Sequence, residues 1–105
     1  RQAPHIPVPS TIIVFNDAIQ LTDSNSLTRA AIYRQMANAY FFKEDFSQAV
    51  DINTRAIGIR NQNPMDSANM AEMAVLYYNN AINYQNSNNY LAAIRSAEQA
   101  FPLFE

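Results

Sequence analysis

The sequence predicts an all-α protein of about five helices, arranged in antiparallel pairs and stacked as a short right-handed α-solenoid. Apolar residues recur at helical spacing along most of the 105-residue chain. The chain has a single glycine, which makes a turn-rich β fold unlikely and excludes a glycine-rich phosphate loop. The residue spacing of one helix pair also recurs 44 positions later. Together these observations indicate a helical repeat.

The first ten residues, "RQAPHIPVPS", contain three prolines and predict an extended linker or arm over 1–10. Ser10 then suits the N-cap of a first helix over about 11–21. Helical spacing in that segment is shown by Ile12, Phe15, Ala18 and Ile19. The stretch "TIIVF" at 11–15 is the only β-branched run, so a strand remains an alternative there.

The next apolar stripe predicts a second helix that ends near Phe42. The residues "KED" form a turn, and Asp45 can cap a third helix with Gln48 as its capping-box partner. This helix should continue to about Arg60, with Gly58 loosening its last turn.

A fourth helix is predicted over about 64–86, with Asn63 as its cap and Pro64 at its first position. "QNSNN" turns the chain, and a fifth helix should follow over about 90–100. Pro102 should end it.

The two predicted helix pairs share six positions at identical spacing, in which each residue of the second pair lies 44 positions after its counterpart. The counterparts are Tyr33 and Tyr77, Ala37 and Ala81, Tyr40 and Tyr84, Phe46 and Tyr90, Ala49 and Ala93, and Ala56 and Ala100. Small residues let two helices approach closely, and aromatic residues beside them fill the gaps. Tyr33, Tyr40 and Phe46 are therefore explained by helix packing rather than by a ligand site, whereas Phe41 has no aromatic counterpart because Gln85 stands in its place.

This spacing resembles the tetratricopeptide repeat, which combines aromatic, leucine and small residues in its first helix with small residues in its second. The matching residues of the first unit are Tyr33, Met36, Ala37, Tyr40, Ala49 and Ala56. Those of the second unit are Tyr77, Ala81, Tyr84, Ala93 and Ala100. The resemblance implies a half repeat over 11–25, a first repeat over 26–62 and a second over 63–105.

The chain departs from the family pattern in two ways. Asn80 occupies the leucine slot, and the second-helix positions where the family prefers phenylalanine carry Asn53 and Ala97. The period is 44 residues, whereas the family has about 34. In this it is similar to longer-helix variants of the family, which occur in regulatory proteins.

Composition disfavours several classes of function. The net charge is −2 and the seven basic residues are scattered, which disfavours nucleic-acid binding. There is no cysteine and no apolar run of about 20 residues, so neither a thiolate metal site nor membrane insertion is expected. The compartment stays open between cytoplasm and periplasm. The chain starts at Arg1 without Met, and we expect it to belong to a larger protein.

No catalytic group is predicted. His5 is the only histidine and has no nucleophile near it, and Glu44 and Asp45 lie in a wet turn where one of them caps a helix. No nucleophile–base pair, metal cluster or cofactor site is recognisable. The prediction is a non-enzymatic protein that needs no cofactor.

The resemblance implies that the first helix of each repeat lines a concave groove for a protein or peptide partner. By register, the groove residues are Arg34, Gln35, Asn38, Phe41, Tyr78, Asn79, Ile82 and Gln85. Family members that grip a peptide's C-terminal carboxylate use a basic residue, an Asn one turn later and an Asn of the next repeat. Arg34, Asn38 and Asn79 occupy these slots, although the family usually has Lys in the first. An ordinary polar helix face is the alternative.

The C-terminal "AFPLFE" suggests a second kind of surface. Phe101, Leu103 and Phe104 are predicted to form an apolar docking end for a neighbouring domain, a partner or a second copy in a homodimer. The sequence therefore predicts a protein-interaction module or scaffold, with a self-associating or regulatory segment of a larger sensor protein as the alternative.

Overall fold

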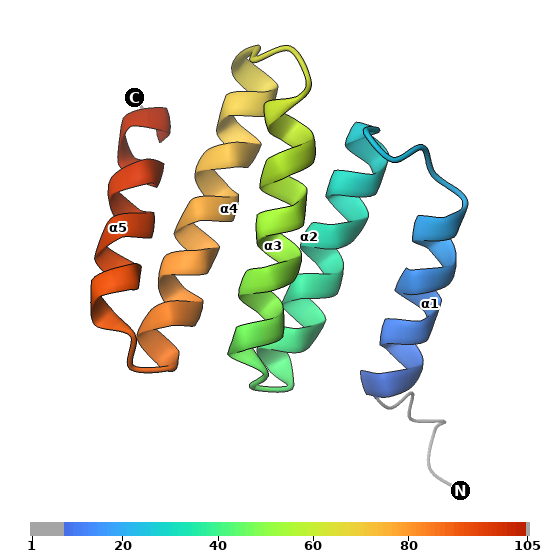
Figure 1. Cartoon of the computed structure of the whole chain (residues 1–105), viewed down its shortest axis with the longest axis horizontal. Helices are drawn as coiled ribbons and strands as arrows, with labels where there is room; N and C mark the ends of the chain where they lie inside the picture. Colours follow the sequence, from blue (N-terminus) through green and yellow to red (C-terminus); the bar gives the residue numbers. More distant parts are fainter. Residues whose placement is uncertain (1–7, 105) are drawn as a thin grey trace, which may run out of the picture.

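A computed structural model describes residues 8–104 of the chain, and these form five α-helices and one short 3₁₀ helix without any strand. The elements are α1 (Val8–Gln20), α2 (Leu27–Phe42), α3 (Phe46–Asn61), α4 (Ser67–Asn86), α5 (Tyr90–Ala100) and η1 (Phe101–Phe104). The helices stand side by side, each antiparallel to the next (Figure 1). This arrangement confirms the predicted all-α class and is that of a short α-solenoid.

The first helix begins earlier than the sequence predicted. The helix already includes Val8, Pro9 and Ser10, so the predicted arm over 1–10 is wrong for these residues, and Ser10 does not cap the helix from outside. A proline is compatible with a first helical turn because its missing N–H would have no acceptor within the helix. "TIIVF" is helical, so the strand alternative is also wrong. Residues 1–7, including His5, lie outside the described residues.

The third helix begins directly after Asp45, the residue predicted to cap it, whereas the fourth helix does not begin at its predicted position. Asp45 Oδ1 accepts a hydrogen bond from the Gln48 N–H at 3.3 Å, which confirms this cap. The N-cap of α4 is Asp66 and not Asn63, because the Asn63 side-chain amide instead donates to the carbonyls of Asn25 and Ile59. α4 therefore begins three residues later than predicted.

Two core clusters hold the helices together in chain order. Residues of α1, α2 and α3 form one cluster, which contains Ile12, Ile19, Met36, Ala37 and Ile52. Residues of α2, α3 and α4 form the other, which contains Ala30, Ala56, Ile57, Ile59, Met73 and Leu76. α3 is thus covered by neighbours on both sides, whereas α5 packs on α4 and has no helix beyond it in Figure 1.

The turns within the two helix pairs have the same backbone geometry. Glu44 and Asn88, 44 positions apart, both adopt a φ of 64°. The N–H of Asp45 donates to the carbonyl of Tyr40 at 2.9 Å, and the counterpart Asn89 N–H donates to the carbonyl of Tyr84 at 2.8 Å. The internal repeat seen in the sequence is therefore also a repeat of local structure.

Candidate functional site

A cavity of about 230 Å³ lies between α2 and α4. Its lining residues come from the C-terminal halves of these two helices: Asn38, Phe41, Phe42, Asn79, Ile82 and Asn83. The lining combines aromatic and aliphatic side chains with three side-chain amides, which is the composition of a site for a partly apolar ligand.

The aromatic wall of the cavity is held by contacts between rings. The ring of Phe41 lies edge-on to Phe42 and to Phe46, with centroids 5.5 and 5.8 Å away. Phe41 is half-buried, whereas 79% of the Phe42 surface is exposed. Phe41 therefore forms a fixed wall, and Phe42 stands at the mouth as a large apolar group in contact with solvent.

The amide residues of the cavity differ in their hydrogen bonding. Asn83 is buried and donates through Nδ2 to the carbonyl of Asn79 at 3.0 Å. The Oδ1 of Asn83 is buried without a hydrogen-bond partner. Asn38 and Asn79 are half-buried. Amides offer both donors and acceptors, so these side chains suit the main chain of a bound peptide.

The structure brings together four of the eight residues that the sequence predicted for the groove, namely Asn38, Phe41, Asn79 and Ile82. Sequence reasoning missed Phe42 and Asn83. Asn83 lies one helical turn after Asn79, so its place on the same face was detectable from spacing. Phe42 follows Phe41 directly, and its contribution depends on where α2 ends.

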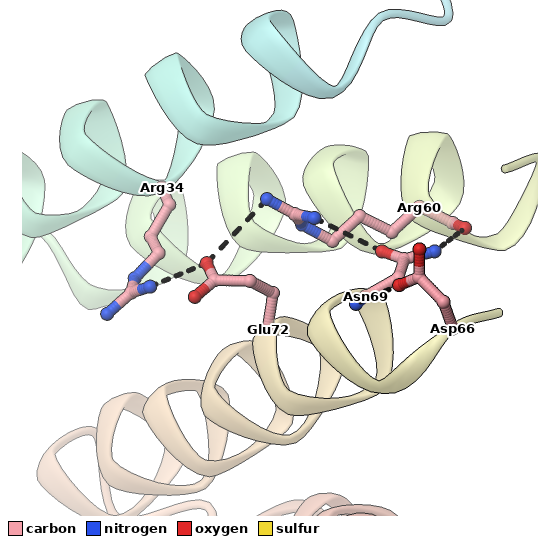
Figure 2. Close-up of polar contacts among 5 residues, drawn as sticks. All are labelled: Arg34, Arg60, Asp66, Asn69 and Glu72. Atoms are coloured by element: carbon pink, nitrogen blue, oxygen red, sulfur yellow. Dashed lines mark hydrogen bonds and ion pairs between the residues drawn. The ribbon is translucent and has the colours of Figure 1, made fainter. Parts of the chain in front are cut away.

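Arg34, the basic member of the predicted carboxylate clamp, already has a carboxylate partner. Its Nη1 donates to Glu72 Oε1 at 2.6 Å, which links α2 to α4 (Figure 2). The same carboxylate oxygen lies 3.6 Å from Nη2 of Arg60 on α3. Arg34 does not line the cavity, so this structure places only Asn38 and Asn79 of the proposed clamp together.

Arg60 and Asn69 extend this polar cluster toward the start of α4. Arg60 is 7% exposed, and its guanidinium donates through Nη1 to Asn69 Oδ1 at 3.1 Å, while Asn69 Nδ2 donates back to the Arg60 carbonyl at 2.8 Å (Figure 2). Asp66 accepts from the Asn69 N–H. A buried charge needs such partners, so the cluster fixes the first turns of α4 against α2 and α3.

The other predicted groove residues lie elsewhere. Tyr78 and Gln85 line a separate groove between α4 and α5, which Ile82 also reaches. Gln35 is exposed on α2 and lines neither hollow. The predicted concave face is therefore divided by α4 into two hollows.

The predicted apolar end is exposed only in part. Phe101 and Phe104 are exposed, as predicted. Leu103 is half-buried and packs on the core cluster of α2, α3 and α4, so it contributes less exposed surface to this end than Phe101 and Phe104. The 3₁₀ turn after Ala100 brings this one side chain back toward the core.

None of the helices within residues 8–104 is both long enough and apolar enough to cross a membrane. The same residues contain no cluster of three histidine or carboxylate side chains that could hold a metal ion.

The fold and the cavity define a small array of antiparallel helices with a groove between two of them. Comparison with models of protein families, with curated proteins and with solved structures finds no match for the chain. Its function therefore has to be argued from its own residues.

Proposed function

We propose that the chain is a non-catalytic protein-interaction module of the tetratricopeptide-like kind, which binds a peptide segment of a partner protein between α2 and α4. The observation that carries this proposal is the cavity, in which Phe41 and Ile82 provide apolar walls beside the amides of Asn38 and Asn79. The matching turn geometry of the two helix pairs supports the assignment to a repeat of this kind.

The size of the cavity favours a side chain over a small-molecule cofactor. Small-molecule sites usually occupy about 300–1,000 Å³, and this cavity has about 230 Å³. One apolar side chain of a peptide fits that volume, and the amides can hydrogen-bond to the main chain on either side of it.

The polar contacts favour an internal segment of a peptide over its C-terminal carboxylate. Arg34 is paired with Glu72, so a terminal carboxylate would have to displace an existing ion pair at 2.6 Å. The energy of binding should come chiefly from burying an apolar anchor against Phe41 and Phe42.

A structural role in self-association or regulation within a larger protein is the second candidate. It is favoured by the exposed rings of Phe101 and Phe104 at the end of the helical array. Such a role would use the end of the array and leave the cavity between α2 and α4 unused.

The proposal is tested with 12-residue peptides selected from a random library for binding to the chain, measured by fluorescence anisotropy. Phe42→Glu places a charge at the mouth of the cavity, and we expect it to weaken binding at least about tenfold, which corresponds to about 1.4 kcal/mol. Phe42 is exposed, so the variant should fold normally.

Leu21→Glu is the matched control, since Leu21 is also highly exposed but lies just after α1, away from the cavity. It should leave binding unchanged, and so should amidation of the peptide's C-terminus. Peptides that bind with equal affinity to the Phe42→Glu variant would contradict the proposed site.

A further inference from the structure

A second, open groove runs between α4 and α5, with a volume of about 360 Å³. We call it the outer groove; it is lined by Tyr78, Ala81, Ile82, Gln85, Tyr90, Ala93, Ile94 and Ala97. Forty-four positions earlier, the counterparts of these residues form the inner groove on the first helix pair: Arg34, Ala37, Asn38, Phe41, Phe46, Ala49, Val50 and Asn53. The repeat therefore allows the two grooves to be compared position by position.

α4 packs against the first helix pair over the inner groove, and the cavity lined by Asn38 and Phe41 remains open at its edge. Glu72 of α4 pairs with Arg34 of α2, and Asn80 of α4 donates to Thr54 Oγ1 of α3 at 3.4 Å. Met73 and Leu76 of α4 belong to the same core cluster as residues of α2 and α3. A helix is thus the natural occupant of this groove geometry within the molecule itself.

Exposure at equivalent positions differs between the two pairs. Ile57 is 7% exposed, and its counterpart Phe101 is 58% exposed. Arg60 is 7% exposed, and its counterpart Phe104 is 56% exposed. Ala49 is fully buried, while Ala93 is only half-buried. Among the residues that line the outer groove, Tyr90 and Ile94 are 59% and 57% exposed, whereas their counterparts Phe46 and Val50 are half-buried. The outer groove therefore presents apolar surface that is less exposed in the first pair.

The two grooves differ at the positions that receive Glu72. In the inner groove, Arg34 and Arg60 converge on the Glu72 carboxylate (Figure 2). Their counterparts in the second pair are Tyr78 and Phe104, whose rings lie edge to face with centroids 6.5 Å apart. An aromatic pair has replaced a pair of guanidinium groups. A carboxylate placed there would lose water without gaining a cation.

From these observations we propose that the outer groove binds an amphipathic helix of a partner protein in the position that α4 takes on the first pair. The bound helix carries an apolar side chain where α4 carries Glu72. Its contact face follows the buried stripe of α4 at steps of three and four: Met73, Leu76, Asn80 and Asn83.

The exposed residues of this chain's own α1 do not provide such a stripe. Over residues 11–20 the exposed apolar side chains are Ile13 and Val14, and Asp17 follows one turn later. A charged residue on that face would be desolvated in the apolar outer groove, so α1 of a second copy does not suit this groove.

The test uses a synthetic peptide of residues 64–86, labelled with fluorescein, in two versions that differ at one residue. The peptide with Glu72→Leu should bind the chain at least about tenfold more tightly than the unchanged peptide, measured by anisotropy. In the chain, Ile94→Lys should abolish this binding, because it places a charge in the outer groove. Ile94 is exposed, so circular dichroism should show an unchanged fold.

Two controls separate this site from others. Leu21→Lys in the chain, a matched substitution beside α1, should not affect binding of the Glu72→Leu peptide. Phe42→Glu should not affect it either, which distinguishes the outer groove from the cavity between α2 and α4. Sedimentation equilibrium of the chain alone should show a monomer.

The proposal is overturned if neither peptide binds, if the unchanged peptide binds as tightly as the Glu72→Leu peptide, or if Ile94→Lys has no effect. It is also overturned if the chain alone dimerises and Ile94→Lys abolishes the dimer, since the occupant would then be a second copy.

Discussion

The two helix pairs of this molecule share a spacing and a turn geometry, yet they have different surroundings. The pair α2–α3 is covered by α1 on one side and α4 on the other. The pair α4–α5 has the preceding helices on one side and, in the described chain, only the short η1 after it. Equivalent positions such as Val50 and Ile94 are consequently half-buried in one pair and exposed in the other. Burial here is set by what packs on a pair, and not by its internal pattern.

The largest change in stability is expected when the same substitution, alanine to leucine, is made at equivalent positions of the two pairs. Ala49→Leu adds three carbon atoms to a fully buried position and should destabilise the fold by about 1–3 kcal/mol through overpacking. Ala93→Leu, the same change 44 positions later, points into the open outer groove and should change stability by less than about 0.5 kcal/mol.

Chemical denaturation of the two variants, with unfolding followed by circular dichroism, gives both values. Equal destabilisation by the two substitutions would show that the outer groove is closed in solution and would break the comparison.

A smaller effect is expected at the turns within the pairs. Glu44 and Asn88 share a φ of 64°, a left-handed conformation that asparagine adopts more readily than glutamate. Glu44→Asn should therefore stabilise the chain by about 0.5–1 kcal/mol, visible as a higher midpoint in urea. The reciprocal change, Asn88→Glu, should destabilise it by a similar amount. Destabilisation by Glu44→Asn or stabilisation by Asn88→Glu would mean that the two turns are not equivalent.

Much of the fold could be predicted because it depends on local pattern. Apolar spacing and the Asp45 cap gave the second, third and fifth helices to within a residue or two of their observed ends. The predicted starts of the first and fourth helices were wrong, because residues other than Ser10 and Asn63 can begin these helices equally well. Pro9 fits a first helical turn, and Asn63 finds other carbonyls to bind.

The candidate sites could be predicted only in part, because they depend on contacts between distant residues. Repeat register identified Asn38, Phe41 and Asn79 on one face. It could not show that Glu72, 38 residues after Arg34, would pair with the guanidinium group of Arg34. The counterpart pair of Tyr78 and Phe104 was likewise detectable only once both side chains were placed in space.

The central claim is that α4 covers the inner groove whereas the outer groove is open, and native-state amide hydrogen exchange tests it most directly. The matched amides are those of Asn53 in α3 and Ala97 in α5, both in helix interiors and 44 positions apart. We expect the Asn53 amide to exchange only through global unfolding, and the Ala97 amide to exchange through a local opening that costs at least about 1 kcal/mol less. Equal opening free energies at these two amides would contradict the account.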